Sequence, residues 1–169
     1  MLTNVKFDSH EYSNEIINKS VSDILNENKL LSLATAKIVE RPWVNHCYFA
    51  FDEEMKLYIL TYPKSEHMDN ISNNPNVAVS IADSTQDSDG YKRGIQLVGV
   101  CRVVDEVELQ SCIDIYTSRF PWFRKYITKP KDFERSSLDS RFYIIEPNEI
   151  KIFDEVIFGE ETWVHVKIN

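Results

Sequence analysis

The chain has 169 residues, of which 43% are hydrophobic and 12% aromatic, enough apolar material for one sizeable buried core. Its 27 acidic and 19 basic residues give a formal net charge of −8, which argues against nucleic acid as the main partner. No apolar stretch reaches the roughly 18 to 20 residues that cross a bilayer, and residues 1–7 lack the features of a signal peptide. We therefore expect a cytoplasmic protein, with no membrane partner, that folds as a single domain over residues 1–169.

The first third of the chain predicts one helix and three strands. Apolar residues recur at helical spacing over residues 11–28, which indicates an N-terminal amphipathic helix. Two β-rich runs follow at residues 30–38 and 44–51, and the turn Glu40-Arg41-Pro42 between them favours a hairpin. Residues 56–61 predict a third strand.

The middle of the chain predicts a short helix between strands. Ser65 is a candidate cap for this helix, which should end at Asn73-Asn74-Pro75. A strand over 77–82, a loop over 83–92 and a strand over 95–104 follow, with Gly99 as a bulge or a point of close backbone approach.

The last third starts with a helix over 107–120 that Pro121 ends, followed by an aromatic cluster at Trp122, Phe123 and Tyr126 that suits core packing or the lining of a pocket. Strand patterns return at 142–145, 150–153 and 163–168. About seven or eight antiparallel strands with few helices predict a mainly β fold, a closed or partly closed barrel.

The cysteines and histidines do not predict a metal site. Cys47, Cys101 and Cys112 are odd in number and lack metal-like spacing, so we expect small buried side chains rather than disulfides or a zinc site. The four histidines show no pairwise spacing typical of ligands, and no hydrolase or nucleotide-triphosphatase motif occurs.

The best candidate for chemistry lies where the third strand gives way to a helix, at Thr61 to His67. The first turn of a helix has unpaired N–H groups and a positive dipole end, which suit a phosphate. Lys64 adds an ammonium group, Ser65 a hydroxyl and His67 a further donor. The alternative interpretation is that Ser65 only caps the helix and Lys64 is only a solvated charge.

Two further segments carry polar groups within apolar strands. Asn45 and His46 are adjacent in the strand 44–51, so one of them should face the interior or an interface; a buried, hydrogen-bonded His is the commoner outcome. In the segment Arg93 to Gly99, Gln96 can recognise the polar edge of a planar ring.

The order of these elements resembles the FMN-binding split-barrel superfamily of pyridoxamine 5'-phosphate oxidase-like proteins. The resemblance rests on Leu33-Ala34-Thr35, the strand ending in Thr61, Ser65-Glu66-His67 and Asn74-Pro75-Asn76-Val77, all between residues 30 and 104. Arg93 to Gly99, Tyr116 to Pro121 and the C-terminal segment look more specifically like a small uncharacterised bacterial branch.

The resemblance implies a split β-barrel, a homodimer and two FMN sites at the subunit interface. It maps the flavin phosphate to Thr61, Ser65 and His67, with Lys64 adjacent. It places the ring along Val44, Asn45 and His46 and against Gln96, and Trp163 of the other subunit is its match for a late tryptophan that approaches the ring.

The chain also departs from the family pattern. The oxidase's basic pair on the second strand is replaced by Val44 and Phe49 or their neighbours, and His67 stands where Lys or Arg is usual. A histidine is only partly charged at neutral pH, so the attraction for phosphate is weaker. We therefore do not expect oxidation of pyridoxamine phosphate itself.

These observations predict an FMN-dependent oxidoreductase that takes hydride from NAD(P)H and reduces a small acceptor. His46 is the first candidate for a catalytic residue. The alternatives are a flavin- or haem-binding sensor without turnover, and a dimeric interaction protein that binds no cofactor.

Overall fold

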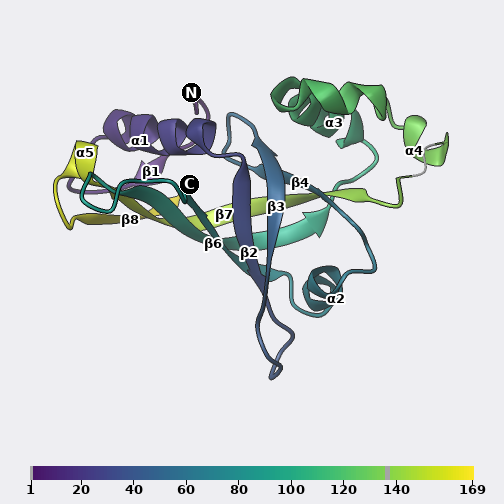
Figure 1. Ribbon diagram of the computed structural model, residues 1–169, viewed down its shortest axis with the longest axis horizontal. Helices are drawn as coiled ribbons and strands as arrows, with labels where there is room; N and C mark the ends of the chain where they lie inside the picture. The colour runs from purple at the N-terminus through teal and green to yellow at the C-terminus, as the bar shows by residue number, and fades with distance from the viewer. Residues whose placement is uncertain (1, 136–137) are drawn as a thin grey trace.

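The computed structural model describes residues 2–135 and 138–169. Within them, eight strands form one antiparallel sheet in the order β1-β8-β7-β4-β3-β2-β5-β6, and a further pairing of β7 with β6 closes six of them into a barrel (Figure 1). The strands are β1 (Phe7–Asp8), β2 (Leu30–Thr35), β3 (Trp43–Phe51), β4 (Leu57–Thr61), β5 (Asn76–Ala82), β6 (Arg93–Val103), β7 (Arg141–Asp154) and β8 (Trp163–Ile168). This confirms the predicted mainly β split barrel.

Five α-helices and a 3-10 helix surround the barrel in the described part of the chain. They are α1 (Asn14–Glu27), α2 (Glu66–Asn73), α3 (Leu109–Arg119), η1 (Pro121–Lys125), α4 (Asp132–Arg135) and α5 (Glu155–Phe158). None of the helices in this part combines the length and the apolarity that a membrane span requires. The sequence patterns predicted α1, α2 and α3 but missed the short elements β1, α4 and α5.

Helix α1 buries one apolar face against the barrel interior. Ser13 caps it by accepting a hydrogen bond from the Ile16 N–H, at 3.4 Å. Ile17, Val21 and Leu25 are completely buried in the core cluster that also contains the inward side chains of the barrel. The predicted amphipathic helix is thus part of the core.

Strand β7 corrects the sequence prediction. Residues 142–145 and 150–153 were expected to form two strands, but Arg141–Asp154 is one continuous strand. Pro147 lies between these two segments and cannot donate a ladder hydrogen bond. The register of β7 against β6 shifts at this point, between Val98 and Gly99, so a bulge accommodates the proline.

Gly99 is required at this bulge because the two backbones come close together. A Cβ atom at this position would lie 2.3 Å from the Glu146 carbonyl oxygen, a distance that real Cβ atoms do not reach. The expected close backbone approach at Gly99 is therefore confirmed.

A second core cluster lies between the barrel and α3 with η1. Tyr116, Phe120 and Phe123 are buried there, and Tyr116 and Phe123 make edge contacts with Phe142 of β7. Of the predicted aromatic cluster, only Phe123 is core, while Trp122 and Tyr126 are 56% and 47% exposed.

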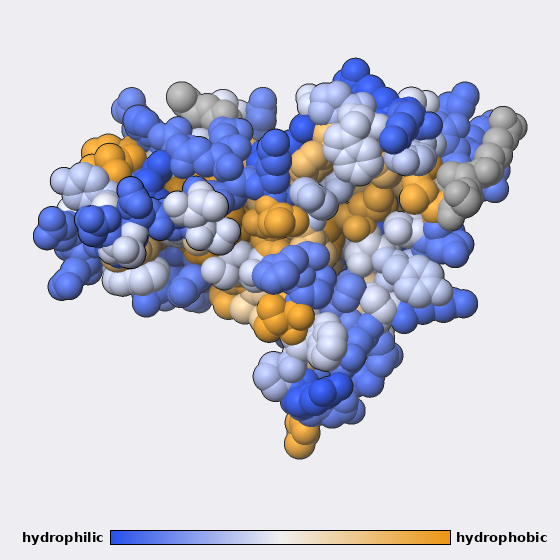
Figure 2. Space-filling model, in the orientation of Figure 1, coloured by the Kyte–Doolittle hydropathy of each residue, from blue (hydrophilic) through white to orange (hydrophobic). Residues whose placement is uncertain are grey.

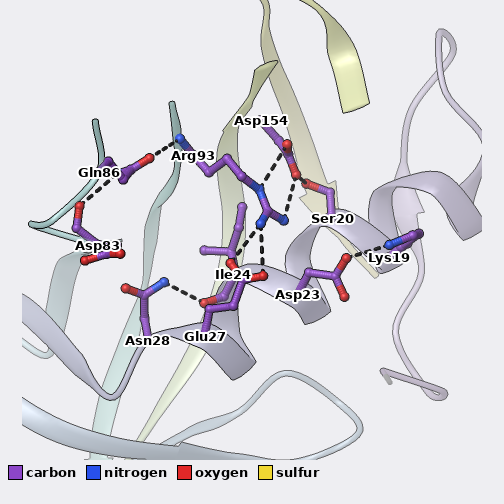
Figure 3. A network of polar contacts seen from close by, with 10 residues as sticks. All are labelled: Lys19, Ser20, Asp23, Ile24, Glu27, Asn28, Asp83, Gln86, Arg93 and Asp154. Atoms are coloured by element: carbon purple, nitrogen blue, oxygen red, sulfur yellow. Dashed lines mark hydrogen bonds and ion pairs between the residues drawn. The ribbon is translucent and has the colours of Figure 1, made fainter. Parts of the chain in front are cut away.

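A polar network ties α1 to the sheet (Figure 3). Asp154, completely buried at the end of β7, accepts hydrogen bonds from Nε and a terminal nitrogen of Arg93, both at 3.2 Å, and from the Ser20 hydroxyl at 2.7 Å. Arg93 also donates to both carboxylate oxygens of Glu27, at 3.0 and 2.8 Å. The buried carboxylate thus has a charged partner and a hydroxyl donor, as its removal from water requires.

We expect Asp154→Ala to lower the free energy of unfolding by about 3 kcal/mol, because the variant leaves Arg93 partly buried with only Glu27 as partner. Urea denaturation measures the loss. Asp89→Ala, in the exposed loop before β6, is the control and should change stability by less than about 0.5 kcal/mol. Equal losses in the two variants would contradict a stabilising role of the network.

Candidate functional site

The predicted phosphate-binding residues come together where β4 ends and α2 begins. His67 Nε2 lies 2.7 Å from the Thr61 hydroxyl oxygen and 3.0 Å from that of Ser65. His67 is 8% exposed, whereas Thr61 and Ser65 are half-buried. We call Thr61, Ser65 and His67 the cradle.

The hydrogen bonds of the cradle determine which groups remain for a ligand. The single hydroxyl hydrogen of Ser65 is donated to the Tyr62 carbonyl oxygen, at 2.7 Å. The His67 contact with Ser65 therefore requires a hydrogen on Nε2, which is shared with the Thr61 oxygen. This assignment leaves the hydroxyl hydrogen of Thr61 free to point at a ligand.

Ser65 does not cap α2 as predicted. It occupies the N-cap position, but its side chain makes no hydrogen bond to the first turn. The hydroxyl turns back to Tyr62 and His67 instead. The correction favours ligand binding, because no capping side chain occupies the N–H groups at the start of α2.

The charges around the cradle are mostly paired. The first turn of α2 carries Glu66 and Asp69, which bind Arg41 at 3.0 Å and Lys37 at 2.7 Å. Lys64 is exposed and makes no ion pair with any residue that the structure describes. Burial lowers the pKa of His67, so its imidazole is neutral at pH 7. Lys64 is therefore the cation of this segment that a phosphate could attract.

The polar pair on β3 divides between the two faces of the sheet. His46 is exposed on the outer face, and its Nδ1 lies 3.1 Å from the Ser32 hydroxyl across the strand pair. Asn45 points inward and its amide donates to Cys47 Sγ at 2.9 Å. Its Oδ1 is buried and has no hydrogen-bond partner among the described residues. Asn45, rather than His46, is thus the inward residue, and His46 is not a buried histidine.

The outer face of the sheet carries a row of polar side chains across six strands. The pairing registers align them in one line, from β8 through β7, β6, β5 and β2 to β3, as His165, Lys151, Gln96, Ser80, Ser32 and His46. The next row contains Val98, Ala78, Ala34 and Val44.

A hollow of about 450 Å³ lies over both rows, and we call it the outer-face hollow. Its lining includes the small side chains of Ala34, Ala78 and Ser80, together with Val44, Gln96, Lys151 and His165. Trp163 lies on the other side of the polar row, opposite Phe153, and the centroids of the two stacked rings are 4.3 Å apart. Lys151 Nζ lies 4.3 Å from the centroid of the Trp163 ring.

The predicted site residues therefore form two groups. Thr61, Ser65 and His67 make the cradle, whereas Val44, His46, Gln96 and Trp163 belong to the outer face. Lys64 is adjacent to the cradle in sequence, and Asn45 faces inward. Sequence reasoning missed Lys151 and His165 as site residues. The alternation of buried and exposed residues along β7 and β8 could have placed both side chains on the outer face, but only the strand register brings them beside Gln96.

Comparison with known proteins identifies relatives of the fold. A family profile described as Pyridoxamine 5'-phosphate oxidase matches residues 17–153. No curated protein matches the chain in sequence.

Solved structures with the same fold include heme-binding proteins. A heme binding protein from Mycobacterium smegmatis has a TM-score of 0.68 and 14% identity, over 94% of this chain and 60% of that one. HutZ, the heme storage protein from Vibrio cholerae, gives 0.61 and 18%, over 88% and 93% of the two chains. A protein from Clostridium acetobutylicum related to general stress protein 26 gives 0.60 and 14%, over 90% and 93%.

The buried cradle histidine predicts a pH dependence of stability. In the folded chain, burial holds the pKa of His67 below its ordinary value of 6.5, which the unfolded chain retains. At pH values between the lowered pKa and 6.5, the unfolded chain therefore binds more protons than the folded chain. Stability is therefore fully present above pH 6.5 and falls as the pH decreases below it. Urea denaturation from about pH 8 down to about pH 5 should show a weaker decline in His67→Gln than in wild type. Exposed His10→Gln is the control, and a decline in His67→Gln equal to that of wild type would contradict the interpretation.

Proposed function

The chain belongs to the Pyridoxamine 5'-phosphate oxidase family, and on this premise we propose that it is a homodimeric, FMN-dependent oxidoreductase. It would take reducing equivalents from NAD(P)H and pass them to a small acceptor. The observation that carries the proposal is the cradle, where two hydroxyls and an imidazole meet within 3.0 Å at the uncapped start of α2.

The cradle fits the phosphate of FMN through hydrogen bonds more than through charge. Thr61 offers a free hydroxyl hydrogen, and the first turn of α2 offers N–H groups at the positive end of the helix dipole. The acidic side chains of that turn are neutralised by Arg41 and Lys37. Lys64, which makes no ion pair within the described residues, supplies an ammonium group on a flexible stem.

The outer face suits a flat ring. Ala34, Ala78 and Ser80 are small, so a planar group can approach the sheet closely, and the Gln96 amide can both donate and accept at the polar edge of a flavin. FMN, when bound, supplies the hydride chemistry. His46, held by Ser32 through Nδ1, presents the rest of its imidazole to solvent and is the candidate to move a proton at the substrate.

The homodimer is supported by the apolar character of the same face. Large apolar side chains on both sides of the polar row are 43% to 57% exposed, and exposed apolar side chains on one face are typical of an interface. They are Leu30, Val44, Tyr48, Val98 and Trp163.

A haem-binding protein without turnover is the second candidate, and His46 favours it. His46 is exposed and Ser32 contacts its Nδ1, which leaves Nε2 for a ligand, the arrangement in which an imidazole is oriented to ligate iron. Two relatives of the fold are named for heme binding and storage.

Cofactor titration tests the proposal. We expect the purified chain to bind FMN with a flavin spectrum and to catalyse NAD(P)H oxidation when an acceptor is supplied. A Soret band on haem addition that His46→Ala abolishes, with no FMN binding, would favour the second candidate. A colourless dimer that ignores both cofactors would contradict both.

The cradle assignment predicts a phosphate-specific loss. The double variant Lys64→Ala with Ser65→Ala should weaken FMN binding by about 10- to 100-fold, because it removes the ammonium group that attracts the phosphate and the Ser65 oxygen that orients His67 in the cradle. Riboflavin, which lacks the phosphate, should bind the variant and wild type equally. The matched control is Lys131→Ala with Ser88→Ala, two exposed residues outside the site. An equal loss for FMN and riboflavin would contradict the assignment.

A further inference from the structure

The hairpin that joins β2 and β3 projects from the barrel and ends in an apolar tip (Figures 1 and 2). Ile38 and Val39 form this tip and are 73% and 100% exposed. In an isolated chain Ile38 would be largely hydrated and Val39 completely so, and hydrated apolar side chains give no stability. We call these two residues the hairpin tip.

The backbone of the tip is also unfavourable for its sequence. Val39 has a φ of 68°, in the left-handed region, which β-branched residues strongly avoid. Glycine or asparagine would adopt this conformation readily. The chain therefore maintains a strained valine at a position where its side chain contacts nothing within the described protomer.

The charges beside the tip are already paired within the chain. Lys37 binds Asp69 at 2.7 Å and Glu40 at 3.8 Å, and Arg41 binds Glu66 at 3.0 Å. The tip thus presents an apolar surface between neutralised charges, which fits an apolar protein surface better than a charged ligand.

A matching receptor lies at the base of the same hairpin. A second hollow, of about 350 Å³, lies between the hairpin base and strands β5 to β7; we call it the hairpin-base hollow. Ala36, Pro42, Val77 and Val98 give it apolar walls, and Asn76 and Asn148 contribute polar groups that could pair with exposed backbone.

The hairpin-base hollow is continuous with the outer face of the sheet. The hairpin-base hollow shares Ala34, Ala78 and Val98 with the outer-face hollow. Val44 and Tyr48, both exposed, lie on the same side of β3. One surface thus offers both a projecting apolar tip and a receiving hollow, the self-complementarity that a two-fold dimer needs.

We propose that the hairpin tip docks into the hairpin-base hollow of a second copy of this chain, so that two subunits exchange tips. The inference rests on the homodimer of the proposed function and identifies the segment that holds it together. Burial of Ile38 and Val39 in the partner offsets the strain that the left-handed valine introduces.

Two substitutions at Val39 test the docking. Val39→Asp places a charge in the apolar contact and should raise the dimer dissociation constant at least tenfold in analytical ultracentrifugation. Val39→Gly should also weaken the dimer, yet it should raise the melting temperature of the dilute monomer because glycine removes the backbone strain. The control is Val107→Asp, since Val107 is 92% exposed but precedes α3, away from both hollows.

The outcomes separate this inference from the proposed function. A wild-type chain that stays monomeric at high concentration would overturn the dimer and the docking together, whereas FMN titration tests cofactor binding independently. A wild-type dimer that Val39→Asp leaves intact would overturn only the docking.

A cross-link tests the docking partner directly. Val39→Cys combined with Asn148→Cys should give a disulfide-linked dimer on a non-reducing gel, while each single variant stays unlinked. The native Cys47, Cys101 and Cys112 are buried and should not take part. No link in the double variant, or a link through Val39→Cys alone, would overturn the assignment of the hairpin-base hollow as receptor.

Discussion

The arrangement of this chain depends on the pairing of β7 with three other strands. Its first half bonds to β4, its second half to β8, and nearly its whole length to β6. The bulge at Gly99 and Pro147 lets this long strand bend while the ladder continues on both sides. Strand β7 therefore both closes the barrel through β6 and carries the additional strand β8. The polar row on the outer face exists because β7 holds β6 and β8 in register.

The two ends of the barrel are closed by helices that polar contacts hold in place. At one end, Arg93 binds Glu27 of α1 and Asp154 accepts a hydrogen bond from Ser20 of α1. At the other end, Asn70 of α2 donates to the Thr35 hydroxyl at 3.1 Å and Asn74 donates to the Ala36 carbonyl at 3.1 Å. The cradle depends on these bonds, because they position the helix turn that carries His67. The candidate site is thus a consequence of how the barrel end is closed.

Sequence reasoning succeeded where the determinants are local. The cradle spans seven residues at one strand-to-helix junction, and the hairpin and α1 follow from short periodic patterns. It failed where pairing is non-local. Residues 142–145 and 150–153 were expected as two strands, whereas β7 continues through Pro147 at a bulge opposite Gly99, nearly fifty residues away. Alternation alone could not decide whether Asn45 or His46 faces inward, and no pattern within one strand could align Lys151 with Gln96.

The hairpin and the cradle are physically linked, which connects the proposed dimer to the proposed cofactor site. Lys37 and Arg41, on either side of the tip, pair with Asp69 and Glu66 in the first turn of α2, the turn that also holds His67. Exposed ion pairs of this kind contribute only about 0 to 1 kcal/mol each. A phosphate at the cradle could therefore attract either cation at small cost, and docking of the tip would change the position of both. Because the same two cations contact α2 from the hairpin, subunit association and phosphate binding would each alter the free energy of the other.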